Sequence, residues 1–124
     1  MKWVKDRVLQ KQLEIVVRQI GFDHISVKHV HCYRTYESKA RAYARIWAFP
    51  KIFQQVLNVE PAYIVEVISE KYDKLSSDQK TKVIIHELLH IPRNFSGSLL
   101  PHKFGNKRID REVDRLYKMM KEKR

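Results

Sequence analysis

The sequence has a single cysteine and no long uninterrupted hydrophobic run. Cys32 has no partner for an intrachain disulfide, so we expect a small buried hydrophobe in a reducing, cytoplasmic compartment. Charged residues interrupt the apolar residues of the N-terminal segment 1–22, which predicts neither a signal peptide nor a membrane span. Internal repeats and low-complexity tracts are also missing, so repeat architectures and linkers are not expected.

Acidic residues are scarce relative to basic ones. The chain has 25 Lys and Arg against 14 Asp and Glu, a formal net charge of +11. This excess attracts polyanions, and we expect weak nucleic-acid binding without sequence preference. Four basic residues interleave with tyrosines but favour a solvated basic face over a nucleic-acid surface: Arg34, Lys39, Arg41 and Arg45.

The 124 residues, 44% of them hydrophobic, predict one domain, residues 1–124, with a core of its own. Hydrophobic periodicity predicts a helix from Trp3 to Ile20, stopped by Gly21. Two strands, 24–34 and 41–50, are expected to pair, with Trp47 and Phe49 in the core. The remaining expected elements are a helical turn at 51–57, a third strand at 62–69, a helix at 75–91 capped by Ser76 or Ser77, and a last helix at 106–123. The predicted fold class is therefore α+β, with a small three-stranded sheet.

The pattern His86-Glu87-x-x-His90 lies inside the apolar segment 82–91. Residues four apart share a helix face, with Cβ atoms about 5–6 Å apart, so His86 and His90 are predicted to bind one Zn²⁺ ion. Glu87 is turned away from the metal but stays near its water, the position of a general base. The alternative is a solvated polar stripe, which the apolar residues around the rest of the helix disfavour.

A hydrolytic zinc site needs three protein ligands and one open position. We favour His102 as the third, because Pro92 ends the helix and Gly97 permits a chain reversal that returns His102 toward the motif. The alternative third ligand is an acidic residue of the last helix: Asp110, Glu112 or Asp114. Those carboxylates are also placed to pair with nearby arginines, as is usual on an exposed helix.

The sequence resembles the phage-type metallopeptidase family over most of its length. The matching stretches are SKARAYARIWAFPKIFQ (38–54), YIVEVISEKYDKLSSDQKTKVIIHELLHIP (63–92), FSGSLLPH (95–102) and DRLY (114–117). The resemblance implies a minimal zincin-like fold, in which the edge strand of a small mixed sheet lies beside the His-Glu-x-x-His helix. It also implies His86, His90 and His102 as metal ligands, Glu87 as the acid-base residue, and peptidase chemistry. A more distant likeness is to the SprT-like proteases, which act on DNA-bound proteins.

Three classes of function remain open. The favoured one is a zinc metallopeptidase acting on protein or peptide substrates. The second is a zinc-dependent nuclease or RNA-processing hydrolase, although Glu87 beside the first ligand suits peptide hydrolysis better. The third is a non-catalytic zinc-stabilised module associated with nucleic acid, which predicts a closed four-ligand site. Tyr117, Arg93 and Asn94 are candidate oxyanion donors, and the sequence favours none of them.

Overall fold

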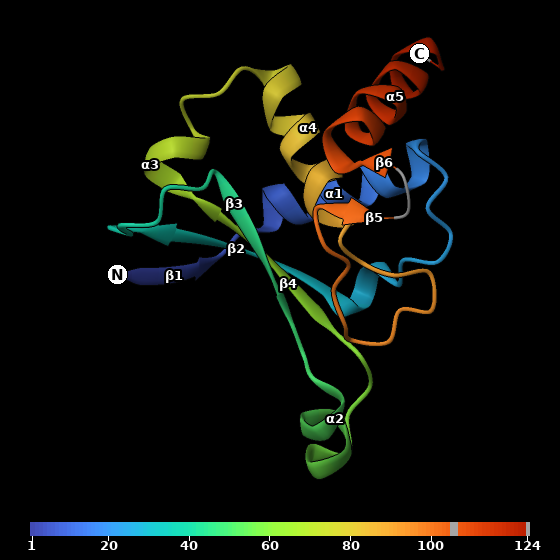
Figure 1. Ribbon diagram of the computed structural model, residues 1–124. Helices are drawn as coiled ribbons and strands as arrows, with labels where there is room; N and C mark the ends of the chain where they lie inside the picture. The colour runs from blue at the N-terminus through green and yellow to red at the C-terminus, as the bar shows by residue number, and fades with distance from the viewer. Residues whose placement is uncertain (105–106, 124) are drawn as a thin grey trace.

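The computed structural model describes residues 1–104 and 107–123, which form an α+β fold (Figure 1). A four-stranded mixed sheet has the order β1-β2-β4-β3. Its strands are β1 (Lys2–Lys5), β2 (Val30–Tyr36), β3 (Ala44–Ala48) and β4 (Tyr63–Ile68). β2 and β4 run parallel, and the other two pairs run antiparallel. The short strands β5 (Lys103–Phe104) and β6 (Lys107–Arg108) pair separately.

The three longer helices cover one side of this sheet (Figure 1). They are α1 (Arg7–Gln19), α4 (Ser77–Leu88) and α5 (Ile109–Glu122). The four-residue helix α3 (Ser69–Tyr72) directly follows β4. Helix α2 (Lys51–Leu57), which confirms the expected helical turn, lies at the far end of β3 and β4 and projects away from the other helices (Figure 1). Within residues 1–104 and 107–123, no helix is long and apolar enough to cross a membrane.

The core lies between the sheet and the three helices. Helix α1 contributes Leu9, Leu13, Val16 and Val17, and α5 contributes the predicted stripe of Ile109, Val113, Leu116 and Met120. Spacings of three and four residues place each set on one helix face, which is the face that packs on the sheet. Cys32 is fully buried among these side chains, as expected of a small hydrophobe.

The α+β class is confirmed, but the expected strand count and the start of the first helix are wrong. Lys2–Lys5 form the edge strand β1, paired antiparallel with β2, and α1 begins only at Arg7. Asp6 sets this boundary, because its Oδ1 accepts a hydrogen bond from the Leu9 amide at 2.9 Å and caps the helix. At its other end, α1 stops as predicted at Gly21, which has a φ of 70°.

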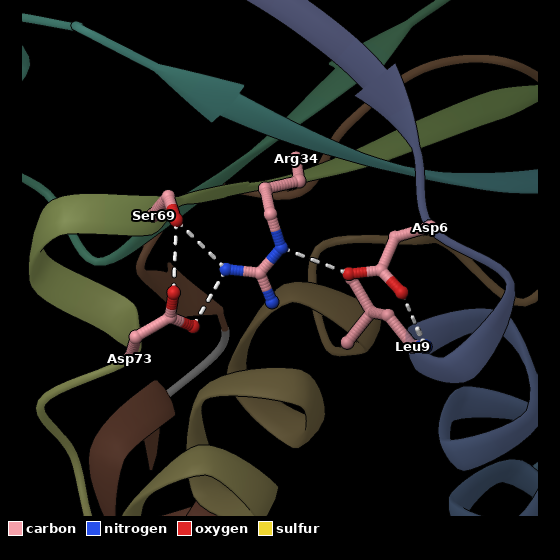
Figure 2. Close-up of polar contacts among 5 residues, drawn as sticks. All are labelled: Asp6, Leu9, Arg34, Ser69 and Asp73. Atoms are coloured by element: carbon pink, nitrogen blue, oxygen red, sulfur yellow. Dashed lines mark hydrogen bonds and ion pairs between the residues drawn. The ribbon is translucent and has the colours of Figure 1, made fainter.

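Asp6 also holds Arg34 of β2 in place (Figure 2). Arg34 Nε donates to Asp6 Oδ2 at 3.0 Å, and Arg34 Nη1 donates to Asp73 Oδ1 at 2.6 Å and to Ser69 Oγ at 3.0 Å. Only 18% of the Arg34 side chain is exposed. Arg34 therefore joins the start of α1 to β2 and α3, and does not belong to the solvated basic face that the sequence predicts.

The expected pairing of β2 with β3 is also wrong, because β4 lies between them. Val65 and Val67 of β4 are 1% and 0% exposed, so β4 is buried enough to occupy a central position. Trp47 of β3 is 46% exposed and not in the core. Alternation along β3 places Trp47 on the face of the sheet opposite to that of Ile46.

Candidate metal centre

Helix α4 begins at a reciprocal cap and carries the first two residues of the motif. Gln79 N donates to Ser76 Oγ at 3.2 Å, and Ser76 N donates to Gln79 Oε1 at 3.0 Å. This capping box confirms Ser76 as the N-cap. His86 and Glu87 lie in the last turn of the helix, close to the edge strand β3.

The helix is shorter than the sequence indicates, because α4 ends at Leu88 and His90 lies in the turn that follows. His90 N donates to Glu87 O at 3.1 Å, three residues back, so the chain winds more tightly here. This turn continues the winding direction of α4. The ring centroids of His86 and His90 are therefore 5.2 Å apart, on one side of the helix end.

Two hydrogen bonds between His90 and Leu100 orient the His90 imidazole. Leu100 N donates to His90 O at 2.7 Å, and His90 Nδ1 lies 2.6 Å from Leu100 O. A carbonyl oxygen only accepts, so Nδ1 carries the proton and Nε2 keeps the lone pair that a metal requires. The sequence gives no local signal for this contact, which depends on where the loop 92–101 returns.

Two side chains hold that loop against the sheet and α2. Tyr63 Oη accepts from Gly97 N and donates to Ser98 O, both at 2.8 Å. Gln54 Nε2 donates to Ser96 O at 3.0 Å. Gly97 has a φ of 94°, and a Cβ on it would meet Gln54 Nε2 and lie 2.5 Å from the backbone oxygen of Phe49, so the reversal expected at this glycine also needs its lack of a side chain.

The loop brings His102 to the other two histidines. The His102 ring centroid lies 5.3 Å from that of His86 and 4.7 Å from that of His90. One ring nitrogen from each residue lies within 4.8 Å of the others. Three ligands about 2.1 Å from a tetrahedral ion are roughly 3.4 Å apart, so side-chain movements of about an ångström would close the triad on a metal. His102 O also accepts from Ile109 N at 3.0 Å, which ties this residue to the start of α5.

Burial sets the protonation of the site. Burial and the charges of His90 and His102 lower the pKa of His86 to about 4. Burial also lowers the pKa of His90. Both imidazoles are therefore neutral near pH 7, the form that binds a metal ion. Burial raises the pKa of Glu87, which is 6% exposed, to about 7.

Asp110 and Asp114 of α5 line the same hollow as the histidines, but these residues and Glu112 have other partners. Asp114 Oδ1 is 3.2 Å from Lys82 Nζ, and Asp110 Oδ1 accepts from Arg111 N at 3.0 Å. Glu112 accepts two hydrogen bonds from Arg115, at 2.6 and 3.0 Å. Within residues 1–104 and 107–123, the group of possible ligands that meets at one point consists of the three histidines.

The histidines and Glu87 open into a cleft of about 730 Å³. One wall is the edge strand β3 with Ala42 and Tyr43 before it, another is the end of α4, and the rest comes from Leu99–His102 and from Asp110, Val113 and Asp114. Lys82 supplies a cationic group to the lining, whereas the guanidinium of Arg45 is bonded to Glu66. The order of the sheet places β3 at its end, so the backbone edge that β3 turns away from β4 faces this cleft.

The candidate oxyanion donors lie elsewhere. The Tyr117 hydroxyl donates to Asp78 near the start of α4. Arg93 borders a different hollow, beside Phe22 and His24. Neither residue lines the cleft, and Asn94 does not line it either. Lys82, which the sequence does not mark as functional, does line the cleft.

Comparison with known proteins agrees with this site. A family model described as "Putative phage metallopeptidase" matches residues 1–121. The match covers nearly the whole chain, so the chain belongs to this phage metallopeptidase family. Family membership indicates a metal-dependent hydrolase, in agreement with three histidines that can bind a metal. No curated protein and no solved structure matches the chain.

Proposed function

We propose that the protein is a zinc-dependent peptidase of minimal zincin-like architecture, with His86, His90 and His102 as ligands and Glu87 as general base. The observation that carries the proposal is the convergence of three imidazoles beside Glu87 in an open cleft. The donor set fits zinc, which binds neutral imidazole, and three ligands leave a fourth position for a reactant. The described residues offer three ligands in this group, which argues against the closed four-ligand site of a purely structural zinc.

Glu87 and the histidines have separate tasks in this proposal. A bound zinc ion supplies Lewis acidity, polarising a peptide carbonyl and making water acidic enough to lose a proton near neutral pH. The Glu87 carboxylate accepts that proton and passes it to the departing amine nitrogen, so that no net charge accumulates on the protein. The bond from His90 to Leu100 O keeps the imidazole in one tautomer and orientation during turnover.

The edge of β3 gives the cleft a way to hold a peptide. Unpaired amide and carbonyl groups along an edge strand bind an extended chain by adding a strand to the sheet. Residues Tyr43–Ile46 line the same cleft as His86 and Glu87. A peptide paired with β3 would run past the histidines with its backbone in register, which favours protein or peptide substrates over nucleic acid in this cleft.

The decisive variant is Glu87→Gln, with Glu122→Gln near the C-terminus as the matched control. Glu87→Gln keeps the shape of the side chain and removes the base, so the purified variant should hold about one zinc per chain but cleave unfolded protein at least ~100-fold more slowly. Glu122→Gln should match the parent in both measurements.

Zinc stoichiometry and cleavage rate are measured on the same preparations, with RNA and single-stranded DNA as further substrates. Undiminished proteolysis by Glu87→Gln would refute the assigned role. Cleavage of RNA or DNA by the parent, abolished in Glu87→Gln, would move the protein to the nuclease class.

A further inference from the structure

One face of the sheet is turned away from α1, α4 and α5 (Figure 1). The alternation of side chains along the strands places a second set of residues there, which the proposed peptidase does not use. We call it the outer face, defined by Trp3, Lys5, His31, Tyr33, Arg45, Trp47, Ile64 and Glu66. The strand register aligns these residues in rows: Lys5 lies opposite Tyr33, Tyr33 opposite Glu66, and Glu66 opposite Arg45. The next row is His31, Ile64 and Trp47.

Two exposed tryptophans on this face are held in fixed positions. Trp3 and Trp47 are 54% and 46% exposed, which is unusual for the largest apolar side chain. Trp3 Nε1 donates to Glu66 Oε2 at 3.2 Å, and Trp47 Nε1 donates to Glu66 Oε1 at 2.6 Å. Both indoles therefore direct their polar edge to the buried carboxylate, which leaves ring surface for contact with a ligand.

The tryptophans border a hollow large enough for a ligand. It has a volume of about 570 Å³ and is lined by Trp3, His31, Tyr33, Trp47, Ile64 and Glu66. Four of these six side chains are aromatic rings. Rings on a rigid sheet form a surface on which flat groups such as nucleobases stack, and this stacking does not depend on the nucleotide sequence.

The charged residues on and around this hollow indicate the class of ligand that it binds. The only carboxylate in the lining, Glu66, is 0% exposed and is paired with Arg45, whose Nε lies 2.9 Å from Glu66 Oε1. Lys5 adds an exposed cation opposite Tyr33, and the chain as a whole has a net charge of +11. A ligand with flat rings and negative charge fits this face better than a neutral glycan or an apolar protein surface.

We propose that the outer face binds single-stranded nucleic acid, with bases stacked on Trp3, Tyr33 and Trp47 and phosphates near Lys5 and Arg45. A duplex buries the faces of its bases, so a single strand is the form that can stack. The site goes beyond the proposed peptidase and lies on the other side of the sheet. Trp47 and its neighbour Ile46 point to opposite sides, and Ile46 lines the metal cleft.

Trp3 and Trp47 are the only two tryptophans of the chain, so intrinsic fluorescence reports directly on the outer face. An oligodeoxythymidylate of about 12 nucleotides, within the range of known single-strand sites, should quench it in a saturable way at low salt. Tyr33→Leu leaves the hydrogen bonds of Glu66 intact and should weaken binding at least fivefold, as loss of one stacked base predicts. Trp47→Leu should weaken it similarly, while Trp47→Phe, which keeps an aromatic face, should retain more affinity.

Matched controls separate stacking from general charge. Lys5→Gln and Lys118→Gln remove the same charge, the latter from α5, and only Lys5→Gln should weaken binding more than twofold. Glu87→Gln should bind like the parent, and Tyr33→Leu should keep its peptidase activity, so failure of this proposal is distinguishable from failure of the peptidase proposal.

Three results would overturn the proposal that the outer face binds single-stranded nucleic acid. One is equal affinity of the parent, Tyr33→Leu and Trp47→Leu for the oligonucleotide, which would leave charge alone as the cause. Another is duplex DNA binding as tightly as the single strand. The third is self-association of the parent in sedimentation experiments that Tyr33→Leu abolishes without any effect of the oligonucleotide, which would make a second copy or another protein the occupant.

Discussion

Replacing Glu66 of β4 with glutamine should destabilise the whole sheet, because this carboxylate is hydrogen-bonded to each of the other three strands. Its oxygens accept hydrogen bonds from Trp3 of β1, Thr35 of β2, and Arg45 and Trp47 of β3. Every partner donates a hydrogen bond to Glu66. The NH2 group of a glutamine would also donate, so it could not replace the carboxylate oxygen that accepts from these partners. Removing one member of a buried charged network costs about 3–5 kcal/mol.

The pKa of Glu66 gives an independent magnitude. Burial opposes its ionisation, but the hydrogen bonds from Arg45, Thr35, Trp47 and Trp3 outweigh burial and lower the pKa from 4.5 to about 2. At about 1.4 kcal/mol per unit, ionised Glu66 contributes about 3 kcal/mol to the free energy of unfolding at pH 7. A depressed carboxyl pKa stabilises fully above the unfolded value near 4.5, and this contribution is lost as pH falls toward 2.

Urea unfolding followed by far-ultraviolet circular dichroism tests both statements, since that signal does not depend on the tryptophans that contact Glu66. Glu66→Gln should lower the free energy of unfolding by about 3 kcal/mol at pH 7. The difference in unfolding free energy between parent and variant should shrink by about 2 kcal/mol on going to pH 3, where Glu66 of the unfolded parent is already protonated. A gap that is the same at both pH values, or below about 1 kcal/mol at pH 7, would refute the reasoning.

Three further predictions concern the metal centre and its supports. His102→Ala should weaken zinc affinity by at least ~10-fold, whereas Asp110→Ala should change it less than threefold. Dye-competition titration measures both affinities. A larger loss in Asp110→Ala than in His102→Ala would favour an acidic third ligand. Gly97→Ala should cost about 2 kcal/mol or more in thermal unfolding and also weaken zinc binding, because φ is positive there and the new Cβ would lie 2.5 Å from the Phe49 carbonyl oxygen. An unchanged melting temperature would contradict the loop geometry. Ser76→Ala should cost about 1 kcal/mol through loss of the α4 cap without changing zinc affinity, and a loss of metal would show that the cap positions the site.

Local patterns predicted the elements whose causes are local. The Ser76 cap, the Gly21 stop and the buried stripe of α5 depend on residues within a few positions of each other, and the structure confirms all three. The motif at 86–90 is likewise a local pattern, although α4 ends before His90. Its return loop was expected from Pro92 and Gly97, and His102 does lie beside the other histidines.

Long-range pairing decided the features that the sequence predicted wrongly. Trp3 and Val4 continue the helical spacing of α1, but pairing with β2, some thirty residues away, makes them a strand. β4 separates β2 from β3, because sheet order depends on how the whole chain packs and not on order along the chain. Long-range packing likewise leaves Arg34 largely buried and Trp47 exposed, the reverse of what the sequence predicts.

By itself the sequence determined which residues this protein has for chemistry: the His-Glu-x-x-His spacing, a later histidine, and an excess of positive charge. These are properties of residue type and short spacing, which a helix turns directly into geometry. Only the tertiary structure decided what surrounds that chemistry. The Leu100 carbonyl that orients His90, the edge of β3 in the cleft, and the Glu66 carboxylate that fixes two exposed tryptophans all join residues distant in the chain. Such contacts form when the chain packs its apolar faces together, and no short pattern encodes which distant partners that packing brings into contact.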